Sequence, residues 1–393
     1  MITKRYTYKF RLYPNEQQKS LLAQHFGNVR YVYNYFLSFR KDAWENDQVS
    51  HNFYDCSNAL PSLKSEFPFL KLSNSQSLQD TVLNLDKAYK AFFSRCKNPK
   101  AKHKGYPSFK RKFDKQSFKV KQNISLSESH IYIPKFDGIK VKLHRPIEGV
   151  IKSATVSKMP SGKYFVAIQV ERDIPRLAEN SNTVGIDLNV KYFVDSNAIF
   201  TMNPLPLKRF LKQIKRLHHQ LSKKVKGSNN YAKVKLKLAK LNEKIANIRR
   251  DHLEKLSRRY INENQVICLE DLDIKQMIAS QTGFGKKAKR RNIFDCGFYS
   301  FKQMILWKAG LYGREVKLCD RFFPSSKTCS SCSHIQDIGE AEYWSCEACK
   351  AHHHRDVNSA LNLTAAGTAV DTCGVHVRPP RRLRTTKQEA SML

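Results

Sequence analysis

Four cysteines near the end of the chain are spaced like the ligands of a metal ion. Cys329 and Cys332 form one C-x-x-C pair, Cys346 and Cys349 form another, and 13 residues separate the pairs. Two such pairs can present four thiolates to a tetrahedral Zn²⁺ ion, so we predict one zinc site, with a redox dithiol as the alternative. Because four cysteines leave no open coordination position, the ion would be structural. The adjacent His352–His354 would then face solvent or phosphate, and the spacer would form the hairpin of a zinc ribbon.

Three acidic residues occur where a carboxylate is unusual. Asp187 lies within the apolar strand "VGIDLNV", Glu270 ends the apolar strand "VICLE", and Asp356 opens the helical segment "RDVNSALNL". A carboxylate is normally excluded from a buried strand, whereas Glu270 alone is consistent with a surface acid and Asp356 alone with a helix cap. Together, the three could hold two Mg²⁺ ions about 4 Å apart, which would activate water and stabilise the leaving 3′ oxygen in phosphodiester hydrolysis.

The charge of the chain predicts a polyanionic partner. Its 393 residues include 70 lysines and arginines against 34 aspartates and glutamates, which gives a net charge of +36. Neutralising phosphates releases condensed counterions and so favours nucleic-acid binding. A basic membrane-surface protein is the competing interpretation, although the sequence has no apolar run of about 18 residues that could span a bilayer. The first residues lack the apolar core of a secretory signal, so we expect a cytoplasmic protein.

Two segments concentrate the positive charge. Residues 207–259 contain 18 lysines and arginines against three acids, and the break at "KGSNNYAK" predicts a hairpin of two basic helices. In "KNPKAKHKGYPSFKRKFDKQSFKVK", cations alternate with the rings of Tyr106, Phe109, Phe113 and Phe118. Bases can stack on such rings while the cations follow the phosphates. In both segments the alternative is a basic surface that is simply solvated.

Hydrophobic periodicity predicts a multidomain α/β protein. Apolar residues at helical spacing predict long helices within the first hundred residues, and alternating residues predict strands between Ile124 and Val170. The segment "FDCGFYSFKQMILWKAGLYG" is predicted to be one helix. A domain boundary is expected near Arg172–Thr183, and the Pro- and Arg-rich end of the chain is expected to be disordered.

Six motifs occur in an order that resembles one protein family. They are "KFRLYPNEQQ…GNVRYVYNYFL", "GIDLNVKYF", "ICLEDL", "FPSSKTCSSC", "CEAC" and "HRDVNSALN". Together they are similar to the TnpB (OrfB) proteins of bacterial and archaeal insertion sequences, which are related to type V CRISPR effectors. The resemblance extends over nearly the whole chain, from Arg11 to Cys373.

The resemblance implies an RNA-guided DNA endonuclease with a RuvC nuclease domain of RNase H-like fold. A zinc ribbon would be inserted in that domain, and a β-barrel wedge domain with a helical recognition lobe would precede it. The catalytic Mg²⁺ ligands would be Asp187, Glu270 and Asp356, and the zinc ligands the four paired cysteines. The partners would be a guide RNA from the transposon's right end and double-stranded target DNA beside a short motif. We expect a monomer on its RNA, associated with the nucleoid of a prokaryotic cell when bound to DNA.

The expected domain boundaries follow the same resemblance. The first barrel strand is expected at residues 1–10, the helical lobe at 11–115, the barrel at 116–180, the nuclease domain at 181–320 with its basic hairpin at 205–260, the zinc ribbon at 321–352, the final helix at 353–376 and the disordered tail at 377–393. The helix around Gln79 resembles the one that meets the target-adjacent motif. Further nucleic-acid contacts are expected from Lys110, Arg111, Lys112, Lys223, Lys224, Lys226, Arg249, Arg250 and Arg355.

Several residues depart from the family's motifs. The family usually has glycine two residues after the first aspartate, where this chain has Asn189. It usually has glycine after each knuckle's second cysteine, and here Ser333 and Lys350 stand instead. Keeping a left-handed turn there would cost about 1 kcal/mol of strain. The family's "HDRD" is here "HHRD", so His354 replaces an acid. None of these changes removes a predicted metal ligand, so they bear on catalytic efficiency and leave the type of reaction unchanged.

Two other functions remain open from the sequence. The first is a guide-dependent DNA-binding repressor that keeps the fold without cutting, although such a protein would be expected to lose a member of the acidic triad. The second is a conventional transposase that uses three acids for strand transfer. The zinc ribbon between the second and third acids, and the motifs near the N-terminus, speak against the transposase.

Overall fold

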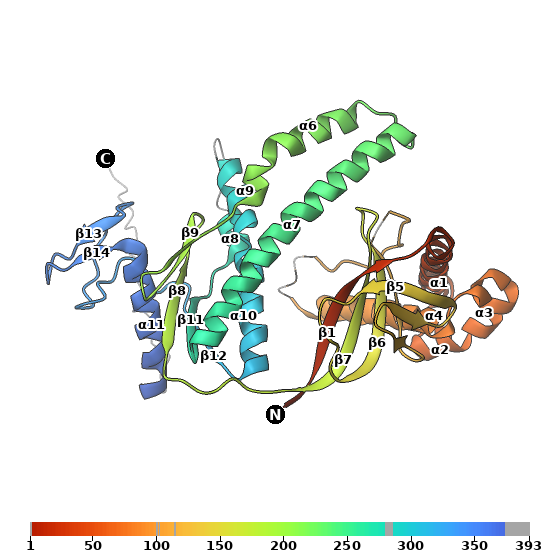
Figure 1. Ribbon diagram of the computed structural model, residues 1–393, viewed down its shortest axis with the longest axis horizontal. Coiled ribbons are helices and arrows are strands. Elements are labelled where there is room, and N and C mark those ends of the chain that lie inside the picture. The colour runs from red at the N-terminus through yellow and green to blue at the C-terminus, as the bar shows by residue number, and fades with distance from the viewer. Residues whose placement is uncertain (1, 100, 102, 114, 280–285, 374–393) are drawn as a thin grey trace, which may run out of the picture. The chain divides into compact units, whose positions relative to one another are not determined.

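The computed structural model describes residues 2–373 except 100, 102, 114 and 280–285 (Figure 1). The chain divides into two compact units, one from Ile2 to Asp173 and one from Ile174 onward. This division falls at the boundary expected near Arg172–Thr183. The predicted disordered tail at 377–393 lies outside the described residues. No helix within the described ranges combines the length and apolar character needed to cross a membrane.

The first unit combines helices with a seven-stranded sheet of strand order β2-β6-β7-β1-β5-β4-β3. Its strands are β1 (Ile2–Tyr13), β2 (Gln116–Val120), β3 (Ser125–Leu126), β4 (His130–Ile133), β5 (Phe136–Lys142), β6 (Val150–Lys158) and β7 (Tyr164–Ile174). Its helices are α1 (Glu16–Asp47), α2 (Phe53–Asn58), α3 (Leu60–Glu66), the 3₁₀ helix η1 (Pro68–Leu72) and α4 (Ser75–Lys97). Asn15 and Gln18 form a capping box that begins α1.

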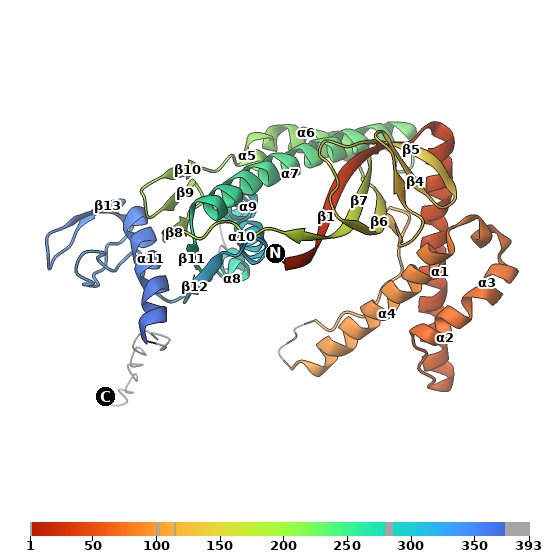
Figure 2. The ribbon, with the colours of Figure 1, turned by 60° about the horizontal axis from the view of Figure 1, so that its bottom comes forward.

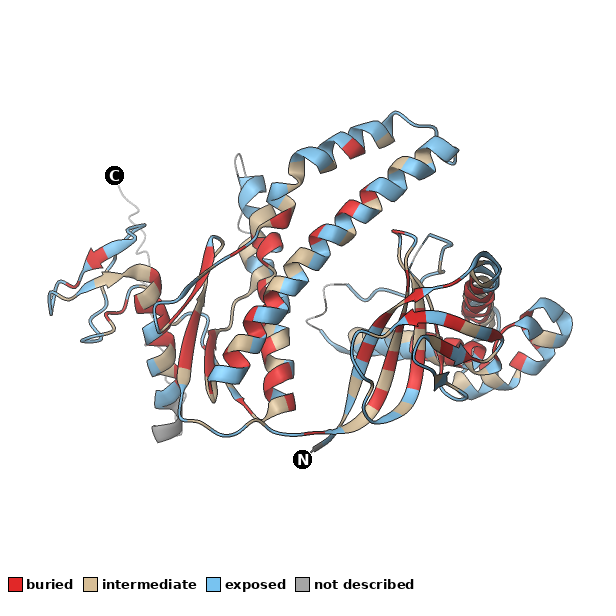
Figure 3. Ribbon diagram, in the orientation of Figure 1, coloured by how far each residue is buried: buried red, intermediate tan, exposed pale blue. Residues whose placement is uncertain are grey.

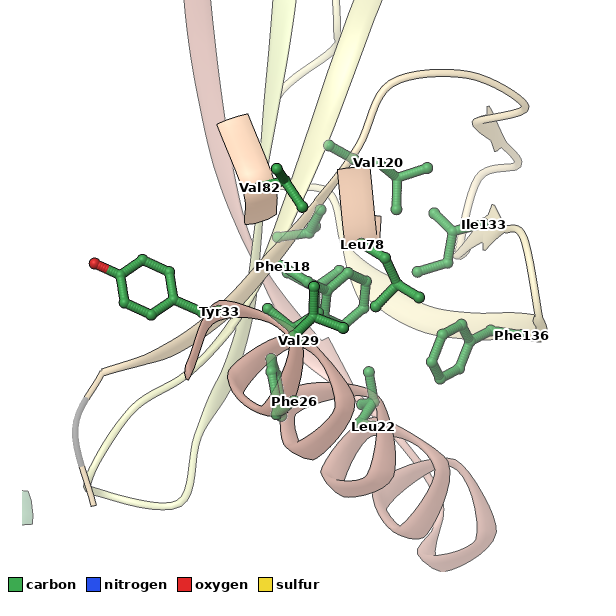
Figure 4. Packing of buried hydrophobic residues seen from close by; sticks show 14 of the residues in the cluster. Leu22, Phe26, Val29, Tyr33, Leu78, Val82, Phe118, Val120, Ile133 and Phe136 are labelled. Atoms are coloured by element: carbon green, nitrogen blue, oxygen red, sulfur yellow. The ribbon is translucent and has the colours of Figure 1, made fainter. Parts of the chain in front are cut away.

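Helices α1 and α4 share one hydrophobic core with this sheet (Figure 4). Phe26 of α1 and Leu78 of α4 are buried together with Phe118 and Phe136 of the sheet. The predicted helical lobe and β-domain therefore form one compact unit. The sheet has two edges, β2 and β3, so its ladders do not close a complete barrel among the described residues. The helices cover the apolar face that barrel closure would otherwise bury, which is why the predicted barrel is open.

The second unit contains a five-stranded mixed sheet of order β10-β9-β8-β11-β12. Its strands are β8 (Thr183–Leu188), β9 (Tyr192–Asp195), β10 (Phe200–Met202), β11 (Val266–Glu270) and β12 (Glu315–Cys319). Its helices are α5 (Pro206–Arg209), α6 (Leu211–Ser222), α7 (Asn229–Glu263), α8 (Ile274–Ala279), α9 (Lys286–Cys296), α10 (Phe298–Tyr312) and α11 (Arg355–Cys373). The β8, β9 and β10 strands pair antiparallel, whereas β11 runs parallel to both β8 and β12.

Helices cover both faces of the five-stranded sheet (Figure 1). Val184 and Ile186 of β8 share a core with residues of α7 and α10, such as Leu253 and Phe301. Since successive strand residues point to opposite faces, Gly185 and Asp187 face the other side, where α11 packs. This alternation places a carboxylate on the face that α11 covers.

The predicted basic helical hairpin is present as α6 and α7, joined at residues 223–228 (Figure 2). Leu217, Leu238, Leu241 and Ile245 form its small core, and its tip is exposed (Figure 3). The single helix predicted across "FDCGFYSFKQMILWKAGLYG" is wrong. Gly297 adopts a left-handed conformation with φ of 71°, which separates α9 from α10, because a right-handed helix cannot pass through that backbone conformation.

Candidate metal centres

Asp187 and Glu270 lie at the carboxyl ends of two neighbouring parallel strands. Ile186 of β8 pairs with Leu269 of β11, so the next residue on each strand is one of the two acids. The carboxyl ends of parallel strands are where α/β sheets usually place their sites. Asp356, in the first turn of α11, is buried and only 4% exposed. The three predicted carboxylates therefore lie in one region, although β8, β11 and α11 are distant in sequence.

Two glycines allow α11 to lie directly on this sheet. A Cβ atom on Gly185 would come within 2.1 Å of the Ala360 carbonyl oxygen, and one on Gly367 within 2.2 Å of Cys268 Sγ. Any side chain at these positions would push the helix away, because such contacts are closer than atoms can approach. The close packing fixes the position of Asp356 relative to β8 and β11.

Polar side chains hold the two aspartates. Asp187 Oδ2 accepts a hydrogen bond of 2.7 Å from Asn189 Nδ2, and its Oδ1 accepts one of 3.3 Å from Ser359 Oγ. Asp356 Oδ2 accepts from the Tyr192 hydroxyl at 2.8 Å, and its Oδ1 accepts from Arg355 Nε at 2.9 Å. Each aspartate oxygen therefore has a donor that fixes its orientation.

The electrostatics of this region favour a bound cation. Burial, together with the charges of Asp356 and Glu270, raises the pKa of Asp187 to about 7. Burial and the adjacent Asp271 also raise the pKa of Glu270 above its usual value. Crowded carboxylates that repel each other gain most from a divalent cation, and oxygen donors suit Mg²⁺. The donor set therefore fits the predicted metal.

The carboxylates are less tightly gathered than the cysteines. In the described part of the chain, the four cysteines are the one set of at least three histidine, cysteine or acidic residues whose ligand atoms all lie within 4.8 Å of one another. The three acids are therefore farther apart than a single shared ion would require. A wider spacing is compatible with more than one ion between them.

A cavity opens beside Glu270. Its volume is about 270 Å³, and its lining includes the apolar Leu188 and Phe298 together with Lys302 and Arg321. Both cations pair with Asp271, Lys302 at 2.5 Å and Arg321 at 2.9 Å. The cavity gives the strand end a concave approach with positive charge at its wall.

The predicted gathering of Cys329, Cys332, Cys346 and Cys349 is confirmed. The sulfur atoms of Cys329 and Cys349 are 3.6 Å apart, as are those of Cys332 and Cys346. Zn–S bonds of about 2.3 Å in a tetrahedron place sulfurs about 3.8 Å apart, so the set fits zinc closely. The backbone N–H of Cys349 lowers the pKa of Cys346, which favours the thiolate that a metal needs.

Both knuckles keep the left-handed turn despite lacking glycine. Ser333 has a φ of 63° and Lys350 a φ of 60°, and each backbone N–H bonds the carbonyl of the first cysteine of its knuckle. The left-handed conformation on which the expected strain depends is therefore kept at both positions. Cys329 and Cys346 accept the turn's closing bonds, which explains why the conformation persists with unfavourable residues.

The spacer and the histidines differ from expectation. The predicted hairpin within the spacer is wrong, because its strand β13 (Tyr343–Ser345) pairs with β14 (His352–His354) across the second knuckle. This pairing turns His353 inward, where its Nε2 lies 3.1 Å from Cys329 Sγ. His354 Nδ1 accepts from the backbone N–H groups of Asp356 and Val357. The imidazole thus caps α11 in place of the acid it replaces, and these two rings do not simply face solvent.

The nucleic-acid contacts expected from the sequence fall into two groups. Gln79, Arg111, Lys112, Lys223, Lys224, Lys226 and Arg250 have exposed side chains. The other three interact within the protein. Lys110 lies over the Tyr33 ring at 3.8 Å, Arg355 binds Asp356, and Arg249 binds the buried Asp295 at 2.5 Å. Arg249 therefore ties α7 to α9 at the root of the hairpin. One of the rings predicted to stack on bases, Phe118, is instead buried in the core. The alternation of cations and rings in the sequence does not show which rings are exposed.

Sequence reasoning missed several side chains that surround the acids. Tyr192, Ser359, Asn358 and Asn362 contact the carboxylates or the loop of the first knuckle. The available signal was three adjacent or nearly adjacent polar residues on the buried face of the last helix. Buried amides need partners, so this pattern indicates a hydrogen-bonded network.

Comparisons with known proteins match most of the chain. The family model OrfB_IS605, described as a probable transposase, matches residues 165–281, and the Cas12f1-like TNB domain matches residues 298–363. A helix-turn-helix model matches residues 1–48, a range in which the structure has the strand β1 and the long helix α1.

Two curated relatives align along nearly their whole length. A protein of Streptomyces pristinaespiralis, named a candidate RNA-guided DNA endonuclease, is 33% identical over 96% of this chain and 93% of its own length. InsQ of Escherichia coli strain K12, given the same kind of name, is 30% identical over 97% of this chain and 97% of its own length. A Cas12f1–sgRNA–target DNA complex covers 92% of this chain and 99% of that chain, at 14% identity and a TM-score of 0.46, too weak a likeness to assign the fold.

Proposed function

Because the chain belongs to the TnpB (OrfB) family of insertion-sequence proteins, we propose that it is an RNA-guided, metal-dependent DNA endonuclease. The observation that carries this proposal is the convergence of Asp187, Glu270 and Asp356 from β8, β11 and α11. Burial, and after it the repulsion from Asp356 and Glu270, raises the pKa of Asp187, and a bound cation would relieve both effects. The mixed sheet with acids at the carboxyl ends of its parallel strands supports a RuvC-type nuclease domain.

In this proposal the chain's residues bind and orient the catalytic ions. Divalent cations, Mg²⁺ by the preference of oxygen ligands, would activate a water and stabilise the leaving oxygen of a phosphodiester. Asp187 and Glu270 hold their places because the ladder between β8 and β11 fixes the strand ends. Tyr192 and Arg355 orient the Asp356 carboxylate by donating to both of its oxygens. The cavity beside Glu270 would admit the substrate strand.

The same proposal assigns the partners and the second metal. The exposed cations of the α6–α7 hairpin tip would bind phosphates of a guide RNA or its target DNA, since a cluster of exposed cations favours a polyanion. The four cysteines would hold one structural zinc, because their sulfur spacing fits a closed tetrahedral site. The zinc ribbon they form lies between the second and third catalytic acids in sequence.

One observation favours a second candidate function. The Asn189 amide and the Arg355 guanidinium already hold oxygens of Asp187 and Asp356. If these donors keep cations out, the protein would bind DNA under RNA guidance without cutting it, as a repressor does.

The test uses the full-length protein copurified with co-expressed RNA from the insertion-sequence end. Target and non-target plasmids are offered with Mg²⁺, and cutting is followed on gels. We expect cutting of the matched plasmid only, with a loss of at least about a thousandfold in Asp187→Ala. The matched control is Asp251→Ala, which removes an exposed acid that pairs with Lys255 one turn later on the same helix. Guide-dependent binding without cutting would establish the repressor, and RNA-independent strand transfer would overturn both.

A further inference from the structure

Two buried asparagines of α11 hold the loop that leads into the first zinc knuckle. Asn358 Nδ2 donates to the Thr328 carbonyl at 2.7 Å, and Asn362 Nδ2 donates to the same oxygen at 2.6 Å and to the Ser325 carbonyl at 2.8 Å. In return, the backbone N–H of Ser330 donates to Asn358 Oδ1 at 2.8 Å. Asn358 is 1% exposed and Asn362 is 5% exposed. Because water cannot replace these bonds, the loop and the helix are locked in one relative position.

The next side chain on the helix extends this network to the carboxylates. Ser359 Oγ lies 2.9 Å from Ser325 Oγ and 3.3 Å from Asp187 Oδ1. A serine hydroxyl has one hydrogen to donate, and a carboxylate can only accept. When ionised Asp187 takes that hydrogen, Ser359 cannot also donate it to Ser325, so the contact between the two serines is kept with Ser325 as the donor. The directed chain Ser325 → Ser359 → Asp187 follows from this hydrogen count.

We propose that Ser359 is a positioning residue for Asp187, and that Ser325, Asn358 and Asn362 hold its hydroxyl in place by fastening the first-knuckle loop to α11. The zinc ribbon would then do more than stabilise its own fold. The loop ending at Cys329 supplies Ser325, the first member of the series of hydrogen bonds that reaches Asp187. The catalytic meaning of this role rests on the proposed function.

The position of Ser359 leaves its hydroxyl few other partners. It is 2% exposed, so solvent cannot satisfy it, and Gly185 brings α11 so close to β8 that the side chain cannot swing outward. Removing the Ser359 hydroxyl leaves one oxygen of Asp187 without this donor and leaves Ser325 without its acceptor. The carboxylate would then be free to turn, and a cation would meet a less ordered ligand.

The test measures Mn²⁺ binding to the full-length, zinc-loaded protein by electron paramagnetic resonance, without nucleic acid. We expect Ser359→Ala to raise the half-saturating Mn²⁺ concentration about tenfold, as outer ligands commonly do. Ser325→Ala should raise it less, and the double variant should do no more than Ser359→Ala, because the two hydroxyls act as one chain. Thr368→Ala is the matched control, since its hydroxyl bonds the carbonyls of Thr364 and Ala365 within α11 and the residue is exposed.

The link to the knuckle has its own variant. Asn362→Ala should both speed zinc loss to a chelator and raise the Mn²⁺ requirement, whereas a loss of zinc retention alone would overturn the coupling. Unchanged Mn²⁺ binding in Ser359→Ala, additive effects of the two serines, or no Mn²⁺ binding by the wild type would overturn the inference. If Ser359→Ala fails to fold, Ser325→Ala, which does not touch Asp187, decides the question. Failure of the proposed function would appear separately, as Mn²⁺ binding without RNA-guided cutting.

Discussion

The side-chain amide of Asn189 donates a hydrogen bond of 2.7 Å to Oδ2 of Asp187, two residues earlier at the end of the same strand. The amide occupies an oxygen that a cation would need, at the position where the family usually has glycine. The donor stabilises the carboxylate and would compete with a metal ion for this oxygen. The presence of Asn189 in place of the family's glycine should therefore weaken metal binding by about the free energy of this hydrogen bond.

Replacing that amide should ease metal binding. In Asn189→Gly, the half-saturating Mg²⁺ concentration for cleavage, or Mn²⁺ concentration for binding, should fall about tenfold, since a hydrogen bond to a charged group contributes about 1.5 kcal/mol. Asn197→Gly in the next hairpin turn is the control, because Asn197 is exposed and lies outside the site. An unchanged metal requirement in a folded Asn189→Gly protein would show that the amide does not compete.

Metal binding should depend on pH in a window set by Asp187. Its pKa is raised from 3.8 to about 7 by burial and by the neighbouring acids, so below pH 7 a proton competes with the cation. The half-saturating Mg²⁺ concentration should rise about tenfold from pH 8 to pH 6, with about one proton released per binding event at pH 6. Calorimetry in buffers of different ionisation enthalpy measures that release. A requirement that stays flat across this window would contradict the raised pKa.

Glycine at the knuckle turns should stabilise the ribbon. Ser333→Gly and Lys350→Gly each remove a side chain from a left-handed backbone, which should contribute about 1 kcal/mol and slow zinc transfer to a chelator about fivefold. Gly339→Ala is the opposing control, since Gly339 has a φ of 55° and open space around it. That variant should be destabilised by strain alone. Equal zinc transfer rates in all three variants would mean that the turns are not strained.

A methyl group at Gly185 should separate α11 from the sheet. Gly185→Ala places a Cβ 2.1 Å from the Ala360 carbonyl oxygen, so the variant should lose at least about 3 kcal/mol of stability and nearly all cutting. Gly310→Ala is the matched control, because nothing lies within 4 Å of its added Cβ and alanine favours a helix by about 1 kcal/mol. Thermal unfolding and cleavage are measured on both. A Gly185→Ala protein as stable and active as the wild type would disprove the close approach.

Local patterns were sufficient where neighbouring residues decide the outcome. The cysteine spacing predicted the gathered sulfurs, the apolar periodicity predicted α1, α4 and the α6–α7 hairpin, and the motif comparison predicted strain at Ser333 and Lys350. One failure came from packing between distant segments and the other from a single glycine. The barrel stayed open because α1 and α4 covered its apolar face, and Gly297 divided a helix whose apolar pattern continues on both sides.

The types of metal ligand in this protein follow directly from its amino acids, because a thiolate or a carboxylate keeps its metal preference in any fold. Only the tertiary structure decided which side chains meet them. Tyr192 and Asp356 are 164 positions apart, and Ser359 and Asp187 are 172 apart. Such pairs depend on strand register and on how closely a glycine lets a helix approach, and neither is encoded by adjacent residues.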